Sequence, residues 1–201
     1  MQRHNVRVWI GEDLIRKCNE SDCQAIYSVI NEAAKAYKGA IPEDRYNDPC
    51  MPMQELRSEM GEMTFFGYEK DGKLLAVAGF QQVRDVTLVR HVYVLPEHQR
   101  KGMGTELLSY IVQTASTRRI LVGTWQAATW AIRFYEKNGF KLQPNKDQLL
   151  KEYWKIPERQ IELSVVLGIE KTAKPQPRSW NKHNLSEKKI RIAQEKVFRP
   201  L

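Results

Sequence analysis

The hydrophobic and polar positions of the first sixty residues predict one strand followed by two helices. Residues 7–10 form a run typical of a strand. Across residues 21–37, apolar side chains recur at helical spacing, namely Ile26, Val29, Ile30, Ala33 and Tyr37. A loop rich in proline and acidic residues covers residues 39–49, and a short helix is expected over residues 53–60.

The middle of the chain predicts three antiparallel strands. Residues 63–69 and 74–82 are largely apolar, and Asp71 and Gly72 between them are a strong hairpin signal. Residues 86–95 form the third strand. Beyond them we expect helices over residues 105–117, 129–138 and 146–154, and strands over residues 120–124 and 160–168.

Composition adds a division of the chain into a body and a tail. The chain has 201 residues, enough for one domain with a core and an appendage, and its formal net charge is +8. Nine basic and two acidic residues lie in 171–201, so the first 170 residues are nearly neutral. We therefore predict a domain over residues 1–170 and a basic extension over residues 171–201, partly disordered or helical.

Several classes of protein are excluded by what the sequence lacks. It contains no apolar run of the roughly 18 residues that a membrane helix needs. Its first residues lack the apolar core of a signal peptide, so we expect no membrane association and a cytoplasmic location. Cys18, Cys23 and Cys50 have no metal-ligand spacing, so we expect reduced thiols and no metal.

The candidate chemistry centres on a basic glycine loop, Gln99-Arg100-Lys101-Gly102-Met103-Gly104, between a strand and a helix. Backbone N–H groups of such a loop, together with the helix N-terminus, favour a phosphate group. The loop lacks the third glycine of a dinucleotide fingerprint and the Gly-Lys-Ser/Thr of a P-loop. A turn that needs glycine only for its backbone is the alternative.

Residues 92–108 resemble the acetyl-CoA motif of the GNAT family of N-acetyltransferases, Gln/Arg-x-x-Gly-x-Gly/Ala after the fourth strand. Residues 131–140 are similar to the family's later helix and following strand, and the resemblance spans about residues 7–168. It implies an α+β (mixed α/β) class and the GNAT-like acyl-CoA N-acyltransferase fold, which has a central, mixed, mostly antiparallel twisted sheet flanked by helices. It also implies acetyl-CoA as the co-substrate.

The resemblance further implies roles for individual residues. Tyr135 would donate a proton to the leaving thiolate, unless it is only a packed tyrosine with a satisfied hydroxyl. The backbone of the fourth strand would pair with the pantetheine arm, and one of its N–H groups would polarise the thioester carbonyl. The N–H groups of the loop would hold the pyrophosphate. The expected cofactor-binding residues are Val92, Val94, Gln99, Arg100, Lys101, Gly102, Met103, Gly104 and Thr105.

The base that deprotonates the acceptor is the weakest part of the match. Alternation from Val92 places Leu88 and Arg90 where family members often have a glutamate, and it sends His91 to the opposite face. His91 has a suitable pKa and is our candidate, although it could equally be a partly buried or surface histidine. Water could also carry the proton to Glu55 or Glu62.

The acceptor site is predicted from residues 37–60, 125–126 and 148–159, which are rich in aromatic and charged side chains. We expect Trp125 to line it and Arg90 to hold a substrate carboxylate or phosphate, or else to pair with an acid such as Asp85. Ala128 stands where the family often has an asparagine that contacts CoA, so one polar contact is missing.

The sequence therefore predicts an N-acetyltransferase that transfers the acetyl group of acetyl-CoA to a primary amine by direct attack. The acceptor would be a small molecule or a peptide, and a homodimer is left open. A non-catalytic CoA-binding module of the same fold is the alternative, motivated by the missing glutamate. Nucleic-acid binding through the basic tail is a third and weaker reading.

Overall fold

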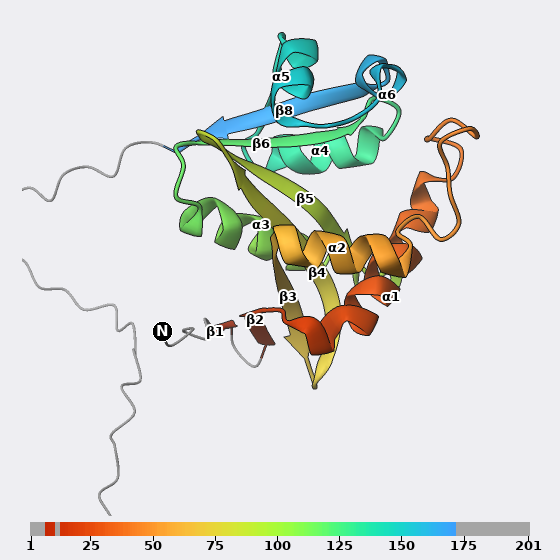
Figure 1. Cartoon of the computed structure of the whole chain (residues 1–201). Helices are drawn as coiled ribbons and strands as arrows, with labels where there is room; N and C mark the ends of the chain where they lie inside the picture. The colour runs from red at the N-terminus through yellow and green to blue at the C-terminus, as the bar shows by residue number, and fades with distance from the viewer. Residues whose placement is uncertain (1–6, 11–12, 172–201) are drawn as a thin grey trace, which may run out of the picture.

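A mixed, eight-stranded sheet organises the computed structural model, which describes residues 7–10 and 13–171 (Figure 1). Its strand order is β1-β2-β3-β4-β5-β6-β8-β7. All neighbouring strands are antiparallel except β5 and β6. The strands are β1 (Arg7–Ile10), β2 (Asp13–Lys17), β3 (Thr64–Lys70), β4 (Lys73–Val83), β5 (Val86–Val94), β6 (Arg119–Trp125), β7 (Lys141–Leu142) and β8 (Ser164–Glu170). The predicted α+β class is confirmed.

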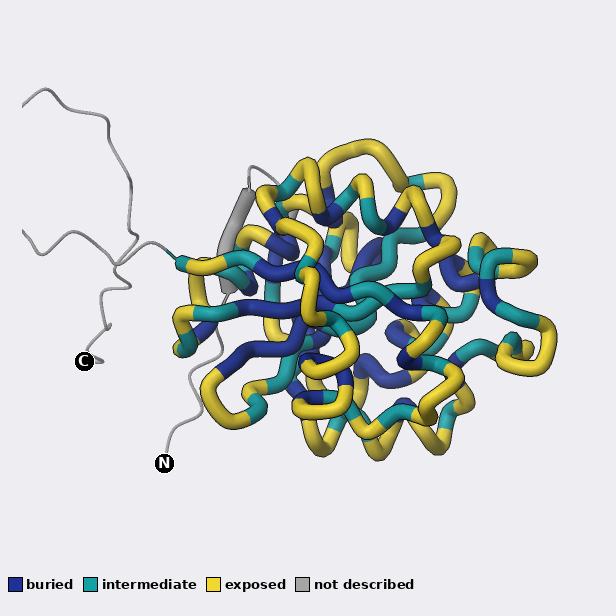
Figure 2. Tube along the Cα trace, turned by 90° about the horizontal axis from the view of Figure 1, so that it is seen from above, coloured by how far each residue is buried: buried dark blue, intermediate teal, exposed yellow. Residues whose placement is uncertain are grey.

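Helices cover both faces of this sheet. Helices α3 (Met103–Thr114) and α4 (Thr129–Lys137) enclose the largest apolar cluster on one face. Helices α1 (Cys23–Ala34) and α2 (Met53–Glu62) pack on the other face over β3 and β4 (Figure 1). Helices α5 (Lys146–Tyr153) and α6 (Glu158–Glu162) cover the β6 and β8 end. Buried residues run along the strands between these layers (Figure 2).

The first helix shows how the sequence produces this packing. Its residues Ile26, Val29, Ile30 and Ala33 are buried at the predicted helical spacing. A short 3-10 turn, Glu20–Asp22, precedes it, and Asn19 and Asp22 form a capping box there. Arg16 then donates to both oxygens of Asp22 at 2.8 Å, which ties the start of the helix to β2.

The feature that positions the site is the separation of β5 from β6. The two strands pair in parallel only between Val86–Val89 and Arg119–Val122. At His91 the backbone has a φ of +53°, and the register of β5 against β4 shifts there by one residue. Such a β-bulge bends its strand. Past the bulge, β5 still pairs with β4 but no longer with β6, so a wedge opens between them (Figure 1).

Two predicted elements differ from the structure. The sequence missed β2, which pairs with β1 and with β3. The strand predicted over residues 160–168 is wrong in its first half, because Pro157 starts helix α6 and the strand begins only at Ser164. The alternation of apolar and polar residues gave the wrong start of the strand, because the buried Ile161 belongs to the helix and not to a strand face.

Two further observations bear on the earlier predictions. The basic extension falls outside the described residues beyond Lys171, so its predicted helix is not tested. Within the described part of the chain, every helix is too short or too polar to cross a bilayer. Cys18, Cys23 and Cys50 are free, and the first two are buried.

Candidate active site

A cavity of about 550 Å³ lies beside the end of β5, and we name it the cofactor pocket. It brings together nearly all of the predicted cofactor residues, namely Val92, Val94, Gln99, Arg100, Gly102, Met103, Gly104 and Thr105, with Tyr135. Lys101 is exposed and is not part of the lining. The sequence did not assign to it the remaining lining residues, namely Ala33, Ala36, Tyr37, Tyr93, His98, Trp130, Ala131 and Phe134.

The glycine loop has the backbone shape of an anion site. Arg100 has a φ of +60° and Gly102 a φ of +92°, and helix α3 begins at the next residue, Met103. Left-handed residues directly before a helix turn successive N–H groups toward one point, where the helix N-terminus adds partial positive charge. A Cβ on Gly104 would lie 3.4 Å from Phe134 and from Val94, in ordinary van der Waals contact with the pocket wall.

The edge of β5 forms the opposite wall of the cofactor pocket. Val92 and Val94 lie past the bulge, where the backbone has no strand neighbour on the β6 side. The carbonyl of Val94 accepts a hydrogen bond from the side chain of Gln99 at 3.1 Å, which ties the loop to the strand. An extended ligand could therefore add to this edge as a strand does.

Tyr135 reaches the same pocket from helix α4. Its ring packs against Phe134 and Phe140, and the residue is only 7% exposed. Burial, with a smaller effect of Tyr37, raises the pKa of its hydroxyl well above the ordinary value. The hydroxyl therefore keeps its proton at neutral pH.

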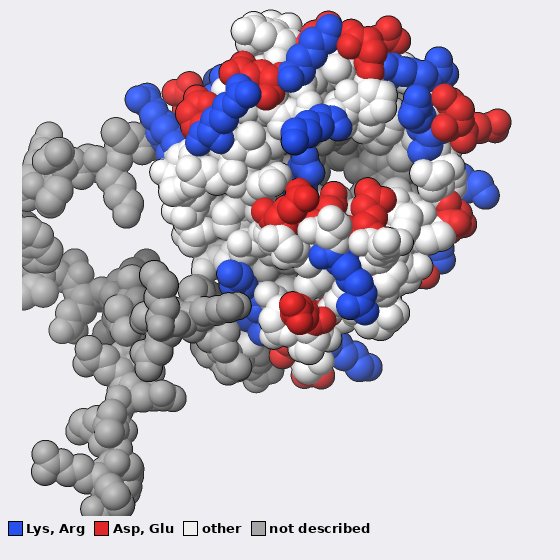
Figure 3. Space-filling view, viewed as in Figure 1, with Lys and Arg blue, Asp and Glu red and all other residues white. Residues whose placement is uncertain are grey.

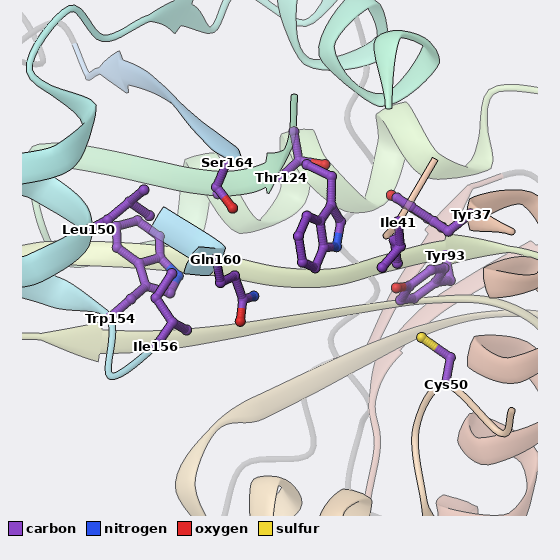
Figure 4. Close-up of a pocket in the computed structure, with 12 residues that line it drawn as sticks. Tyr37, Ile41, Cys50, Tyr93, Thr124, Leu150, Trp154, Ile156, Gln160 and Ser164 are labelled. Carbon is purple, nitrogen blue, oxygen red and sulfur yellow. The ribbon is translucent and has the colours of Figure 1, made fainter. Parts of the chain in front are cut away.

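A smaller cavity of about 170 Å³ adjoins the cofactor pocket, and we name it the aromatic pocket (Figure 4). It shares Tyr37 and Tyr93 with the cofactor pocket. Trp154 comes into it from the end of α5 and Cys50 from the loop before α2 (Figure 4). Trp125, the last residue of β6, is also part of the lining. This places the predicted acceptor residue Trp125 next to the cofactor pocket.

A third space of about 820 Å³ opens over α2, and we name it the acidic hollow. It shares Gly123, Trp154, Ile156 and Gln160 with the aromatic pocket. Three glutamates of α2 line it, Glu55, Glu59 and Glu62, and acidic side chains are seen beside a hollow in Figure 3. The three spaces thus follow one another from the glycine loop to the α2 face.

The predicted faces of β5 are wrong at the bulge. We expected His91 to point away from Arg90, yet both side chains reach the same carboxylate. Nε2 of His91 lies 2.6 Å from Oε2 of Glu59, and Nη1 of Arg90 lies 3.9 Å from Oε1. The extra residue of the bulge breaks the alternation on which the expectation rested. Leu88, before the bulge, is fully buried in the core.

Glu59 is the residue that the sequence reasoning missed. We named Glu55 and Glu62 as carboxylates within reach, and both line the hollow, but the contact with His91 comes from Glu59. The three glutamates share one helical face because they are four and three residues apart, a signal that was present in the sequence. Arg90 does form a salt bridge with an acid, as in our alternative for it, but the partner is Glu59 and not Asp85, which accepts a hydrogen bond from Tyr153.

These charged groups are buried without full hydrogen bonding. Within the described residues, Glu59 Oε2, Arg90 Nε and His91 Nε2 are buried atoms with no well-aligned hydrogen-bond partner. Burial would raise the pKa of Glu59, but the contact with His91 and the charge of Arg90 outweigh it, so this pKa lies below its ordinary value. Buried polar atoms of this kind are uncommon in folded proteins, and a catalytic role is one of their known explanations.

A strand edge opened by a bulge, a glycine loop at a helix N-terminus and a buried tyrosine thus meet around one cavity. The sequence model of the Acetyltransferase (GNAT) family matches residues 14–140, more than half of the chain. The chain therefore belongs to the GNAT family of acetyltransferases, and the predicted family is confirmed.

Two individual relatives are each similar to about half of the chain. The chain is 32% identical to L-amino acid N-acyltransferase MnaT of Escherichia coli over 111 residues, which cover 50% of this chain and 62% of MnaT. It is 29% identical to UPF0157 protein YqkA of Bacillus subtilis over 114 residues, or 54% of this chain and 33% of YqkA. The chain thus spans less than two thirds of either relative.

The fold has close solved counterparts. The structure of yncA from Salmonella typhimurium with acetyl-CoA, described as a putative acetyltransferase, matches with a TM-score of 0.58 and 21% identity. That match covers 85% of this chain and 100% of the other. At this identity the likeness shows the fold, and it confirms the predicted GNAT-like sheet.

Proposed function

We propose that the chain is an N-acetyltransferase that transfers the acetyl group of acetyl-CoA to a primary amine. The observation that carries this proposal is the cofactor pocket. One cavity of about 550 Å³ contains the glycine loop, the free edge of β5 and Tyr135, although these are far apart in the sequence. Family membership supports the same donor, and the fold counterpart from Salmonella typhimurium was solved with acetyl-CoA.

The donor would bind through backbone groups. The N–H groups of the loop from Arg100 to Thr105 hold the pyrophosphate, because the loop and helix α3 direct N–H donors and partial positive charge to one point. Val92 and Val94 offer their backbone to the pantetheine arm as an added strand. An N–H at the bulge then polarises the thioester carbonyl.

Tyr135 would protonate the leaving thiolate of CoA. Its hydroxyl keeps its proton at neutral pH and lies in the same cavity as the strand edge. It can therefore pass a proton to the CoA sulfur as the carbon–sulfur bond breaks. Because the amine attacks the thioester directly, no covalent intermediate on the enzyme is needed.

The acceptor would enter through the acidic hollow. Its three glutamates favour a cationic amine, and the aromatic pocket with Trp125 suits an apolar portion beside the thioester. Arg90, whose buried Nε has no hydrogen-bond partner among the residues that the structure describes, suits an anionic group near the amine. An amino acid or a peptide N-terminus fits this pattern, and MnaT is described as acting on L-amino acids.

The alternative, a CoA-binding module without turnover, was motivated by the absence of a base at Leu88 and Arg90. The contact between His91 and Glu59 weakens that motivation, because it supplies a titratable pair at the same strand. We therefore retain the enzyme as the proposed function.

Two measurements on the full chain test it. Calorimetry with acetyl-CoA should show binding, and thiol release should appear with at least one member of an amine panel of L-amino acids, polyamines and short peptides. Absence of binding at millimolar acetyl-CoA would refute the proposal that acetyl-CoA is the acetyl donor. Tight binding with no thiol release across the panel would favour the binding module.

A further inference from the structure

We propose that Glu59 positions His91 as the proton acceptor of the reaction and stabilises the protonated imidazole. The inference rests on the proposed acetyl transfer and adds a residue from α2, outside the motifs that carry the family resemblance. Glu59 does not touch the reacting atoms in this scheme. It acts through His91.

The geometry fixes the imidazole on several sides. The ring of His91 stacks on Phe65 at 5.8 Å and on Tyr93 at 6.4 Å, with interplanar angles of 18° and 23°. At its edge, Nε2 lies 2.6 Å from Glu59 Oε2. The His91 side chain is 17% exposed and the Glu59 side chain 19% exposed. The two ring contacts and the short contact with Glu59 together restrict how the imidazole can turn.

The position of His91 suits a proton acceptor. It is the bulge residue itself, next to the strand edge that we propose for the thioester, and it lines the acidic hollow. Tyr93, on which it stacks, lines both the aromatic and the cofactor pockets. An amine that approaches the thioester from the hollow therefore passes His91.

Glu59 is held in place by its helix. Leu56, on the same helix, is fully buried in the cluster beneath α2, so the helix cannot turn its glutamates away from β5 without exposing it. Arg90 lies 3.9 Å from the other oxygen of Glu59 and helps to keep the carboxylate ionised. The other charged or titratable groups facing the hollow are Glu55, Glu62, Arg84, Tyr153 and Lys155.

The proton balance follows from this arrangement. The acceptor ammonium gives one proton to the unprotonated nitrogen of His91, and its lone pair forms the carbon–nitrogen bond with the acetyl carbonyl. The carbon–sulfur bond breaks with its electron pair on sulfur, and a second proton from the nitrogen reaches sulfur by way of Tyr135. His91 then releases the first proton to solvent through the hollow. The products are the amide, the CoA thiol and one proton.

Glu59→Gln tests the role of the carboxylate, with kinetics measured across pH at saturating acetyl-CoA and amine. We expect kcat to fall about 10-fold, and His91→Gln to lower it about 100-fold, within the range for general base catalysis. Loss of the carboxylate should move the acidic limb of kcat toward lower pH by about one unit, because a nearby negative charge favours the imidazolium. The double variant should be no slower than His91→Gln alone.

Two further variants separate positioning from other effects. Glu62→Gln removes a charge from the same hollow, so it should raise KM for the amine and leave the acidic limb where it is. Glu32→Gln on α1, at an exposed position whose carboxylate pairs with Lys35, should change neither KM for the amine nor the acidic limb of kcat. Glu59→Asp should return the acidic limb of kcat part of the way to its wild-type pH, because it restores a carboxylate on a shorter side chain.

The proposal would be overturned if the acidic limb of kcat stayed at its wild-type pH in a folded Glu59→Gln variant. It would also be overturned if this limb shifted equally in Glu59→Gln and Glu62→Gln. Thermal unfolding of each variant establishes that it is folded before kinetics are compared. Wild-type binding and turnover are measured first, so a failure of acetyl transfer itself is seen separately.

Discussion

Trp130 offers a quantitative test of the cofactor pocket. It lies in the wall of this pocket, meets Tyr37 edge to face at 5.3 Å, and is 43% exposed, which is unusual for a tryptophan. A tryptophan can bury up to about 250 Å², so roughly 100 Å² of Trp130 is open. If bound CoA covers half of that, about 50 Å² at ~25 cal/mol per Å² gives about 1.3 kcal/mol. Trp130→Ala should therefore weaken acetyl-CoA binding about 10-fold.

Calorimetry on both proteins measures this change, and tryptophan fluorescence in the wild type should respond to acetyl-CoA. Leu142→Ala is the matched control, since Leu142 is 50% exposed and lies on β7, outside the pocket lining. Equal affinities in the wild type and Trp130→Ala would refute the placement of the cofactor against α4. A comparable loss in Leu142→Ala would show that the effect is not local.

Three other predictions follow from single residues. Tyr135→Phe should lower kcat about 100-fold and leave the acetyl-CoA Kd within twofold, measured by steady-state kinetics and calorimetry; an unchanged kcat would remove its proton-donor role. Gly102→Ala and Gly72→Ala both place a side chain at positive φ, so each should lower the free energy of unfolding in urea by about 1–2 kcal/mol. Of the two variants, only Gly102→Ala should weaken acetyl-CoA binding. Asp22→Asn should destabilise the fold by roughly 1–3 kcal/mol at pH 7, because it breaks the double contact with Arg16. The hydrogen bonds from Arg16 lower the pKa of Asp22, so its contribution is present above about pH 4 and is lost as pH falls further. In urea unfolding, the difference between Asp22→Asn and the wild type should therefore shrink below that pH, and a constant difference would contradict the assignment.

Much of the fold could be predicted because its signals are local. The helical spacing around Ile26 and Val29, the Asp-Gly turn between β3 and β4 and the glycine loop before α3 each depend on a few neighbouring residues. The start of β8 could not be read in the same way. The alternation of Ile161, Leu163 and Val165 is equally compatible with a short buried helix followed by a strand, and Pro157 decides between them by starting α6.

The same distinction between local and non-local signals applies to the site. The predicted cofactor-binding residues lie within one motif, and the structure brings all of them except Lys101 into one cavity. The contact between Glu59 and His91 joins residues 32 positions apart through the packing of α2 on the sheet, and no local pattern contains it. Period-2 alternation moreover gave a definite and wrong answer at His91, because a bulge leaves no clear mark in a run such as Val89, Arg90, His91, Val92.

The bulge links the two halves of the proposed chemistry. Without it, β5 would continue beside β6 past Val89, and the edge at Val92 and Val94 would be paired instead of free for a cofactor. Arg90 and His91 would also point to opposite faces, and only one of them could reach Glu59. One inserted residue therefore both opens the strand edge and turns a histidine toward a carboxylate on α2. A deletion that restored regular pairing in β5 should consequently remove acetyl-CoA binding and the histidine–glutamate contact together.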